Sequence, residues 1–296
     1  MQEKTPLSSA SGLLLCVLNV SLSYTAIMSN IVTVHAVRKT ASLSENLKTL
    51  LLSQAVSDIG VGLVAQPLYV ARMILYWSQG TENNPTYFAI MIMHIIASNL
   101  FSFATIHGAM ALCTDRFMAV HLHLRYQELV THKRVVGVVI LIWALSGFLS
   151  FARLWMSINN YFMYAILAIF ISACIVTATF FSVKICWFVR RHVSELHVLQ
   201  APQVTQNGQM ANILRLRKFA IASVYLNLFF LICYLPNIFT SFAVAFTSYP
   251  LSIKLKALHG YSLTLLYLNS SINPLIYCGK MKHIRHTVIN ILRNTF

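Results

Sequence analysis

The sequence is short of charge, and it is especially short of acids. Only 10% of its 296 residues are charged, whereas an ordinary soluble domain has about 25%, and the 22 bases greatly outnumber the seven acids. Because 57% of the residues are hydrophobic, the composition excludes an ordinary soluble protein and indicates a lipid bilayer. The net charge of +15 raises nucleic acid as a partner. The bases, however, lie in short segments between apolar runs, which argues against that partner.

Acids are nearly absent from the apolar runs themselves. Asp58 is the only acid in the middle of any run, and the sequence contains no inverted repeat. A transporter or channel usually has several charges near the membrane midplane or such a repeat. A seven-helix transporter therefore stays an alternative with little support from the residues.

Seven apolar runs are each long enough to cross a membrane as a helix. The third contains no charged residue from Tyr87 to Thr114, and these 28 residues can span a hydrocarbon core of about 30 Å. The sequence predicts an all-α membrane protein with a seven-transmembrane helix bundle. The runs cover residues 13–37, 47–76, 87–120, 135–156, 160–189, 213–247 and 257–279.

The segments before and after the bundle are expected to be short. Residues 1–12 form the amino terminus, 13–279 the bundle, and 280–296 a short tail. In this tail, bases alternate with apolar residues at helical spacing, which predicts a short amphipathic eighth helix on the membrane surface. The first run has no cleavage site for a signal peptidase, so we expect it to be retained.

The bases also predict the orientation of the chain. If the amino terminus lies outside, 17 of the 22 Lys and Arg residues fall on the cytoplasmic side and five outside. This asymmetry predicts an extracellular amino terminus and a cytoplasmic tail in a multi-pass plasma-membrane protein.

Asp58 needs polar partners, because burying a lone acid in a membrane is costly. Other runs supply polar residues at a comparable depth. These are Asn30, Thr105, Asn269, Ser270 and Asn273. Their oxygen atoms, together with the carboxylate, are suitable ligands for a sodium ion. The alternative is a hydrogen-bonded network that packs the helices without an ion.

Two further features mark the cytoplasmic half. Asp115 and Arg116 end the long uncharged run, either as an anchor at the membrane face or as a functional pair. Three prolines, Pro67, Pro236 and Pro274, lie inside the runs, and each removes a backbone donor and weakens the preceding turn. We expect hinges in the sixth and seventh runs.

Six features follow one another in order along the runs. With them the chain resembles the rhodopsin-like (class A) family of G-protein-coupled receptors over nearly its whole length. The resemblance implies a receptor, not an enzyme, that binds an extracellular ligand in the bundle and activates a heterotrimeric G protein. The features are Asn30, Asp58, Asp115-Arg116-Phe117, Trp143, Cys233-Tyr234-Leu235-Pro236 and Asn273-Pro274-Leu275-Ile276-Tyr277.

The resemblance implies roles for these residues. Asp115 would hold Arg116 at rest, and outward movement of the sixth helix would release it while Tyr277 swings in beneath. Tyr234 takes the position of the family's usual tryptophan. Asp58 and its neighbours resemble the family's sodium pocket, and no other cofactor is implied. The residues expected to carry coupling and activation are Asp115, Arg116, Tyr234, Pro236, Asn273, Pro274 and Tyr277.

The chain departs from the family at the outer end of the third run, where most members have a disulfide. Met91 stands at that position, and all six cysteines lie in or beside the runs. The missing outer disulfide, together with the lack of a proline in the fifth run, is similar to melanocortin receptors, and more loosely to cannabinoid, lysolipid and adenosine receptors. The unusual Phe117 and Tyr234 also leave open an orphan or decoy receptor with weak coupling or none.

The ligand class stays open between a peptide, a lipid and a nucleoside-like molecule. Ser98 stands where the family's amine receptors carry an acid, and Tyr267 where opsins carry the retinal-binding lysine, which argues against both ligands. Alternatively, the bases of the upper cavity only meet lipid headgroups. The residues expected to bind a ligand are Arg72, His94, Ser98, Ser102, Arg153, Asn237, Ser241, His259 and Tyr267.

Overall fold

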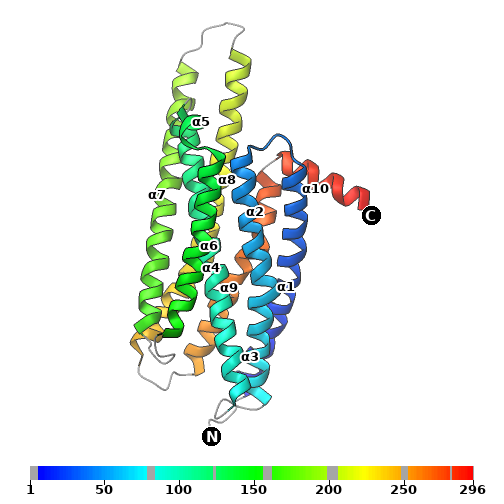
Figure 1. The fold of residues 1–296 in the computed structure, drawn as a ribbon, viewed down its shortest axis with the longest axis vertical. Coiled ribbons are helices and arrows are strands. Elements are labelled where there is room, and N and C mark those ends of the chain that lie inside the picture. Colours follow the sequence, from blue (N-terminus) through cyan, green and yellow to red (C-terminus); the bar gives the residue numbers. More distant parts are fainter. Residues whose placement is uncertain are drawn as a thin grey trace.

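The protein is a bundle of long helices that lie side by side (Figure 1). The computed structural model describes residues 6–78, 84–122, 125–155, 162–198, 206–247, 253–280 and 282–295, and these residues contain no strand. The long helices are α1 (Pro6–Lys39), α4 (Pro85–His121), α6 (His132–Trp155), α7 (Phe162–Val198), α8 (Gln206–Phe246) and α9 (Ile253–Lys280).

Shorter elements complete the bundle. The second predicted span is divided into α2 (Glu45–Gly60), a π-helical turn η1 (Val61–Ala65) and α3 (Gln66–Ser78). A four-residue helix, α5 (Tyr126–Leu129), lies between α4 and α6. Helix α10 (Lys282–Thr295) points away from the bundle, at the end opposite to the one where α1 begins (Figure 1).

Six of the described spans are long and apolar enough to cross a membrane. Helix α9 is not among them, although it lies against α1 and α8 in the bundle. Its middle contains Asn269, Ser270, Ser271 and Asn273, which lower its hydropathy but are all buried. The seventh predicted span is therefore a helix of the bundle, with its polar side chains turned inward.

Hydrogen bonds between α1 and α9 explain how these polar groups are accommodated. The Asn19 amide donates to the Thr264 hydroxyl at 2.9 Å, and the Asn30 amide donates to the Ser270 carbonyl at 2.9 Å. Ser271 donates to the Leu22 carbonyl at 3.1 Å. In a bilayer such groups must be satisfied within the protein, so these bonds tie α9 to α1.

The π-helical turn η1 ends two residues before Pro67, the proline expected to weaken the second span. Proline has no backbone N–H and its ring clashes with the preceding turn, and a wider turn relieves both problems. The chain therefore continues into α3 without leaving the bundle.

Apolar side chains occupy both the core and the outer surface. Ile140, Leu141 and Phe148 on α6 are each about 64–65% exposed. A soluble monomer rarely exposes such a contiguous apolar face, whereas lipid tails cover it in a bilayer. The core contains two clusters, one around Tyr234 and Tyr267 and the other around Leu51 and Tyr277.

Candidate functional site

A buried ion pair lies near the end of α4, on the side of the bundle where α10 lies. The Nε atom of Arg116 donates to the Asp115 carboxylate at 2.9 Å, and a second guanidinium nitrogen donates to the same oxygen. Asp115 is 5% exposed and Arg116 is 8% exposed. These values do not fit an anchor that extends into water, because such a side chain would be exposed.

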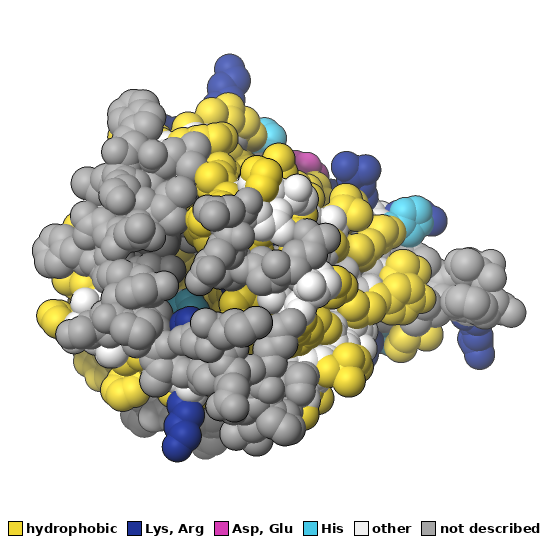
Figure 2. Space-filling model, turned by 90° about the horizontal axis from the view of Figure 1, so that it is seen from below, with side chains coloured by type: hydrophobic (Ala, Val, Ile, Leu, Met, Phe, Trp, Pro, Cys, Tyr) yellow, Lys and Arg dark blue, Asp and Glu magenta, His cyan; other side chains and the backbone are white. Residues whose placement is uncertain are grey.

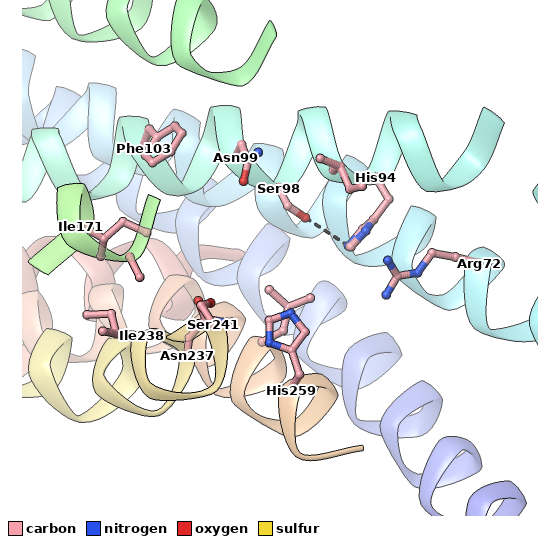
Figure 3. A pocket seen from close by; sticks show the side chains of 13 residues that line it. Arg72, His94, Ser98, Asn99, Phe103, Ile171, Asn237, Ile238, Ser241 and His259 are labelled. Atoms are coloured by element: carbon pink, nitrogen blue, oxygen red, sulfur yellow. Dashed lines mark hydrogen bonds between the residues drawn. The ribbon is translucent and has the colours of Figure 1, made fainter. Parts of the chain in front are cut away.

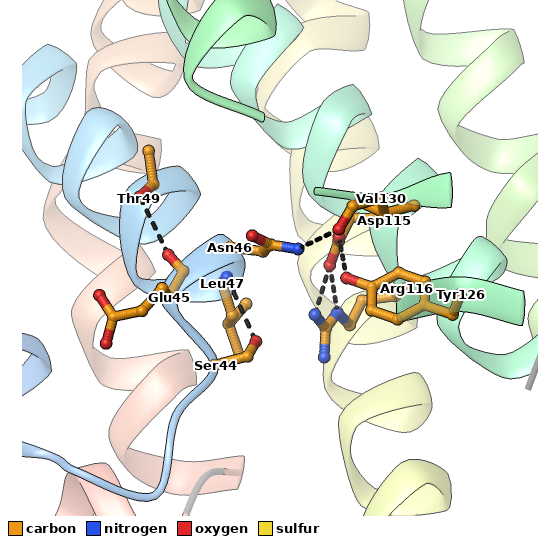
Figure 4. A network of polar contacts seen from close by, with 9 residues as sticks. All are labelled: Ser44, Glu45, Asn46, Leu47, Thr49, Asp115, Arg116, Tyr126 and Val130. Atoms are coloured by element: carbon orange, nitrogen blue, oxygen red, sulfur yellow. Dashed lines mark hydrogen bonds and ion pairs between the residues drawn. The ribbon is translucent and has the colours of Figure 1, made fainter. Parts of the chain in front are cut away.

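Tyr126 of α5 holds the other oxygen of Asp115, as Figure 4 shows. Its hydroxyl donates at 2.6 Å, and burial raises the pKa of Tyr126 to about 12, so it stays a donor at neutral pH. The Asn46 amide of α2 donates to the Val130 carbonyl at 2.8 Å and fastens the same loop. Neither Tyr126 nor Asn46 was among the residues that the sequence indicated.

The predicted switch residues of α8 and α9 are buried in the core. The ring of Tyr234 stacks on Phe230 with centroids 5.4 Å apart, and Ile106 belongs to the same cluster. Pro236 and Pro274 both lie inside continuous helices, so neither helix is broken there. Tyr277 packs in the second cluster and is 3% exposed.

Asp58 lies at the centre of the bundle and is fully buried. One carboxylate oxygen accepts a hydrogen bond from the Asn273 amide at 2.8 Å, and the other accepts one from the Thr105 hydroxyl at 3.4 Å. Thr105 also donates to Ser57 at 3.0 Å. The structure thus brings together the acid and two of its predicted partners from three different helices.

Several buried oxygens on the helices around this carboxylate have no hydrogen-bond partner among the described residues. They are the side-chain oxygens of Asn30, Asn269 and Asn273, all of them buried. Unpaired buried acceptors are costly, and a hard cation is held by such oxygen atoms. The residues present therefore fit a sodium ion, which would be held by Asp58 and neutral oxygens. The Ser270 side chain also interacts with Asp58, and the Ser270 carbonyl accepts the hydrogen bond from Asn30.

At the end where α1 begins, the bundle encloses a cavity of about 140 Å³ between α3, α4, α7, α8 and α9. Figure 2, which looks onto this end, shows a Lys or Arg and a His side chain recessed below their surroundings. Arg72, His94 and His259 gather at one end of the cavity in Figure 3, and Phe103, Ile171 and Ile238 lie at the other.

Three polar side chains form one wall of this cavity. Nε2 of His94 lies 2.9 Å from the Tyr267 hydroxyl and 3.1 Å from the Ser98 hydroxyl, and the two hydroxyls also bond to each other. The other ring nitrogen of His94, Nδ1, is buried and has no partner in the described part of the chain. Tyr267 is fully buried behind Ser98 rather than on the surface of the cavity.

The structure places most of the predicted ligand-binding residues around the cavity. Arg72, His94, Ser98, Asn237, Ser241 and His259 line it. Ser102 is half-buried on α4 and is not among the lining residues, because Phe103 occupies the wall at that level. The side chain of Arg153 lies outside the described residues. Asn99 lines the cavity and was missed, although the adjacent Ser98 was among the predicted residues.

Comparison with known proteins supports a receptor fold. Residues 29–277 match the model of the family described as 7 transmembrane receptor (rhodopsin family). The chain is 22% identical to the adenosine receptor A2a of Canis lupus familiaris over 307 aligned positions, which cover 93% of this chain and 71% of that receptor. It is 32% identical to the adenosine receptor A2b of Gallus gallus over 130 residues, or 44% of this chain and 36% of that receptor.

These relatives belong to a receptor group that the sequence indicated only loosely. They do not support the melanocortin-like subgroup, which stays a prediction from missing features alone. The family consists of membrane receptors rather than enzymes, and the apolar helices agree with a multi-pass plasma-membrane protein. With its family match across most of the seven spans, the chain belongs to the rhodopsin-like family of seven-transmembrane receptors.

Proposed function

We propose that this protein couples an extracellular ligand, bound in the cavity of about 140 Å³, to activation of a heterotrimeric G protein. The observation that carries the proposal is the buried Asp115–Arg116 pair at the opposite end of the bundle, held in place by Tyr126. A charge pair that can be released there is a switch, because the freed guanidinium becomes available to a partner protein.

Contacts between the two ends support such coupling. Tyr267 bonds to cavity residues and shares one hydrophobic cluster with Tyr234, Phe230 and Ile238. A packed cluster with two discrete arrangements can carry a ligand's effect to the far end of the bundle. Outward movement of α8, hinged near Pro236, would open the space beneath Arg116.

Nucleotide exchange on purified G proteins tests the proposal. Full-length protein in lipid nanodiscs is mixed with each major class of heterotrimer, and the rate of guanine-nucleotide exchange is compared with that of empty nanodiscs. Accelerated exchange with one class supports G-protein coupling. Exchange at the empty-disc rate for every class, with and without candidate ligands, would favour a decoy or a transporter.

A second question is whether adenosine is the ligand, because the relatives described above are adenosine receptors. Adenosine added to the exchange assay gives a direct answer. A rise in exchange would place this chain with those relatives in ligand as well as in family. A melanocortin peptide in the same assay tests the other subgroup.

We predict that sodium ions stabilise the inactive state through Asp58. The ion would balance the carboxylate and satisfy the unpaired oxygens of Asn269 and Asn273. The melting temperature in sodium chloride should exceed that in the chloride of a large organic cation, and Asp58→Asn should remove the difference. No sodium-dependent gain in the unmodified protein, or an equal gain in Asp58→Asn, would contradict the site.

We predict measurable signalling without ligand. Many family members carry an acid on the inner end of the sixth helix that pairs with the coupling arginine, and here Leu216 stands between two bases, Arg215 and Arg217. Their side chains lie outside the described residues. An exposed ion pair contributes ~0.2–1 kcal/mol, so Leu216→Glu should lower basal exchange by up to about fivefold. Basal exchange at the rate of empty nanodiscs, or no decrease in Leu216→Glu at equal protein concentration, would refute signalling without ligand.

A further inference from the structure

The cavity near the start of α1 has an unusual balance of charge. Arg72, His94 and His259 come from three helices, and no Asp or Glu is among the described residues that line the cavity. Two lysines, Lys254 and Lys256, are exposed at the start of α9, close to the same end. The field of these groups favours anions over cations at the mouth of the cavity.

Arg72 lacks a carboxylate partner in the described part of the chain, where the ion pairs are Lys48–Glu45 and Arg116–Asp115. Its guanidinium lies 5.3 Å from the centre of the Tyr69 ring, a cation–π contact that leaves the edges of the group available for hydrogen bonds. A partly buried guanidinium in a membrane protein needs an anion, and a carboxylate fits its two parallel donors.

Two further hydrogen-bond donors at the cavity have no acceptor among the described residues. Nδ1 of His94 and the amide nitrogen of Asn99 are both buried without a partner among the described residues. When the Ser98 or Tyr267 hydroxyl donates to Nε2 of His94, the ring proton lies on Nδ1. That nitrogen is then a donor, and a ligand oxygen would satisfy it.

The opposite end of the cavity is apolar. Phe103, Ile171 and Ile238 lie there, away from the basic side chains (Figure 3). The volume of about 140 Å³ resembles that of an engineered protein cavity of about 150 Å³ that holds one benzene molecule. The ligand should therefore have a compact apolar body and one charged end.

From this polarity we infer that the cavity binds a small organic anion, a monocarboxylate on an apolar body of about one aromatic ring. The carboxylate would lie between Arg72 and His94, and the body would extend toward Phe103. The inference rests on the proposed function in taking this cavity as the receptor's ligand site. A neutral nucleoside would leave the charge of Arg72 without a counter-ion, so the cavity favours an anion over adenosine.

Binding of benzoate to the full chain in phosphatidylcholine nanodiscs tests the inference. Benzamide and benzylamine are the matched neutral and cationic probes, and isobutyrate is a second carboxylate. We expect a carboxylate to raise the melting temperature in a saturable manner, whereas benzamide and benzylamine do not. Stabilisation by benzamide equal to that by benzoate, or none by either carboxylate, would overturn the inference.

Variants then locate the anion. Arg72→Gln should weaken benzoate binding about ten- to hundredfold, because hydrogen bonds to a charged group are lost, and Arg72→Lys should restore part of it. Lys254→Gln removes an exposed base that does not line the cavity, and because water and salt screen its charge it should weaken binding by no more than about twofold. An equal loss of benzoate binding in Lys254→Gln would show that the overall positive charge at this end, rather than Arg72, attracts the anion. Displacement of benzoate by added phosphatidylglycerol would assign Arg72 to lipid headgroups.

Two controls remove competing explanations. Glu82 lies outside the described residues and is an acid of the same end in the predicted topology. Unchanged benzoate binding in Glu82→Gln agrees with a ligand anion, whereas a gain of about tenfold or more would show that Glu82 is the partner of Arg72. Nucleotide exchange is measured on the same samples. Carboxylate binding without exchange would refute G-protein coupling only, and exchange without carboxylate binding would refute the ligand class only.

Discussion

Arg116→Ala is expected to abolish G-protein activation while most of the protein still reaches the cell surface. The guanidinium is the charge that a G protein would meet once α8 moves outward, and alanine leaves no charge at this position. Asp115 keeps the hydrogen bond from Tyr126, so the carboxylate is not left without a donor. Nucleotide exchange should therefore fall by at least about tenfold, to the level of empty nanodiscs.

The control for this variant is Arg38→Ala, an exposed base at the end of α1 on the same side of the bundle. It should exchange nucleotide like the unmodified protein. Surface expression is measured in both variants by antibody labelling of a tag on intact cells. Full signalling in Arg116→Ala at equal expression would exclude the proposed switch.

Gly62→Val is expected to remove most of the folded protein. A Cβ atom at this position would lie 2.9 Å from the backbone oxygen of Ser23 on α1, and 3.2 Å from the Cβ of Ala26. The Ser23 hydroxyl also donates to the Gly62 carbonyl at 2.7 Å. A valine would force η1 and α1 apart, break this bond and cost ~1–3 kcal/mol or more.

Surface expression of Gly62→Val should fall several-fold, and the melting temperature of the remaining protein should decrease. Gly147→Val is the matched control, because a Cβ atom built at Gly147 on α6 meets no atom within 4 Å. It should express normally. Equal expression and melting temperature for the two variants would show that the contact between η1 and α1 is not needed.

Hydropathy alone was sufficient to predict most of the fold. The charge-free stretch from Tyr87 to Thr114 lies inside α4, whose start is set by Asn84 and Pro85. The backbone N–H of Tyr87 donates to the Asn84 side chain at 3.1 Å, and Pro85 needs no donor in the first turn. Pro67 predicted a weak point in the second span. Whether the helix would kink there or widen into a π-helical turn depends on its packing.

At the site, too, some contacts follow from the sequence and others depend on packing. Asp115 and Arg116 are adjacent in the sequence, so their pairing needs only a helix end. Tyr126 reaches Asp115 from a four-residue helix in a loop, and no periodic pattern predicts such a contact. Asn99 and Ser102 on α4 differ in their relation to the cavity because its depth is set by side chains such as Phe103.

The π-helical turn sets the rotational phase of everything that follows it in the second span. A regular α-helix advances by about 100° per residue, so the one extra residue of a π turn rotates α3 by about that angle relative to α2. Tyr69 and Arg72 face the core and the cavity because of this offset. Asp58 on one side of the turn and Arg72 on the other can therefore point into the same bundle, and loss of a single residue between them would turn the arginine toward the lipid.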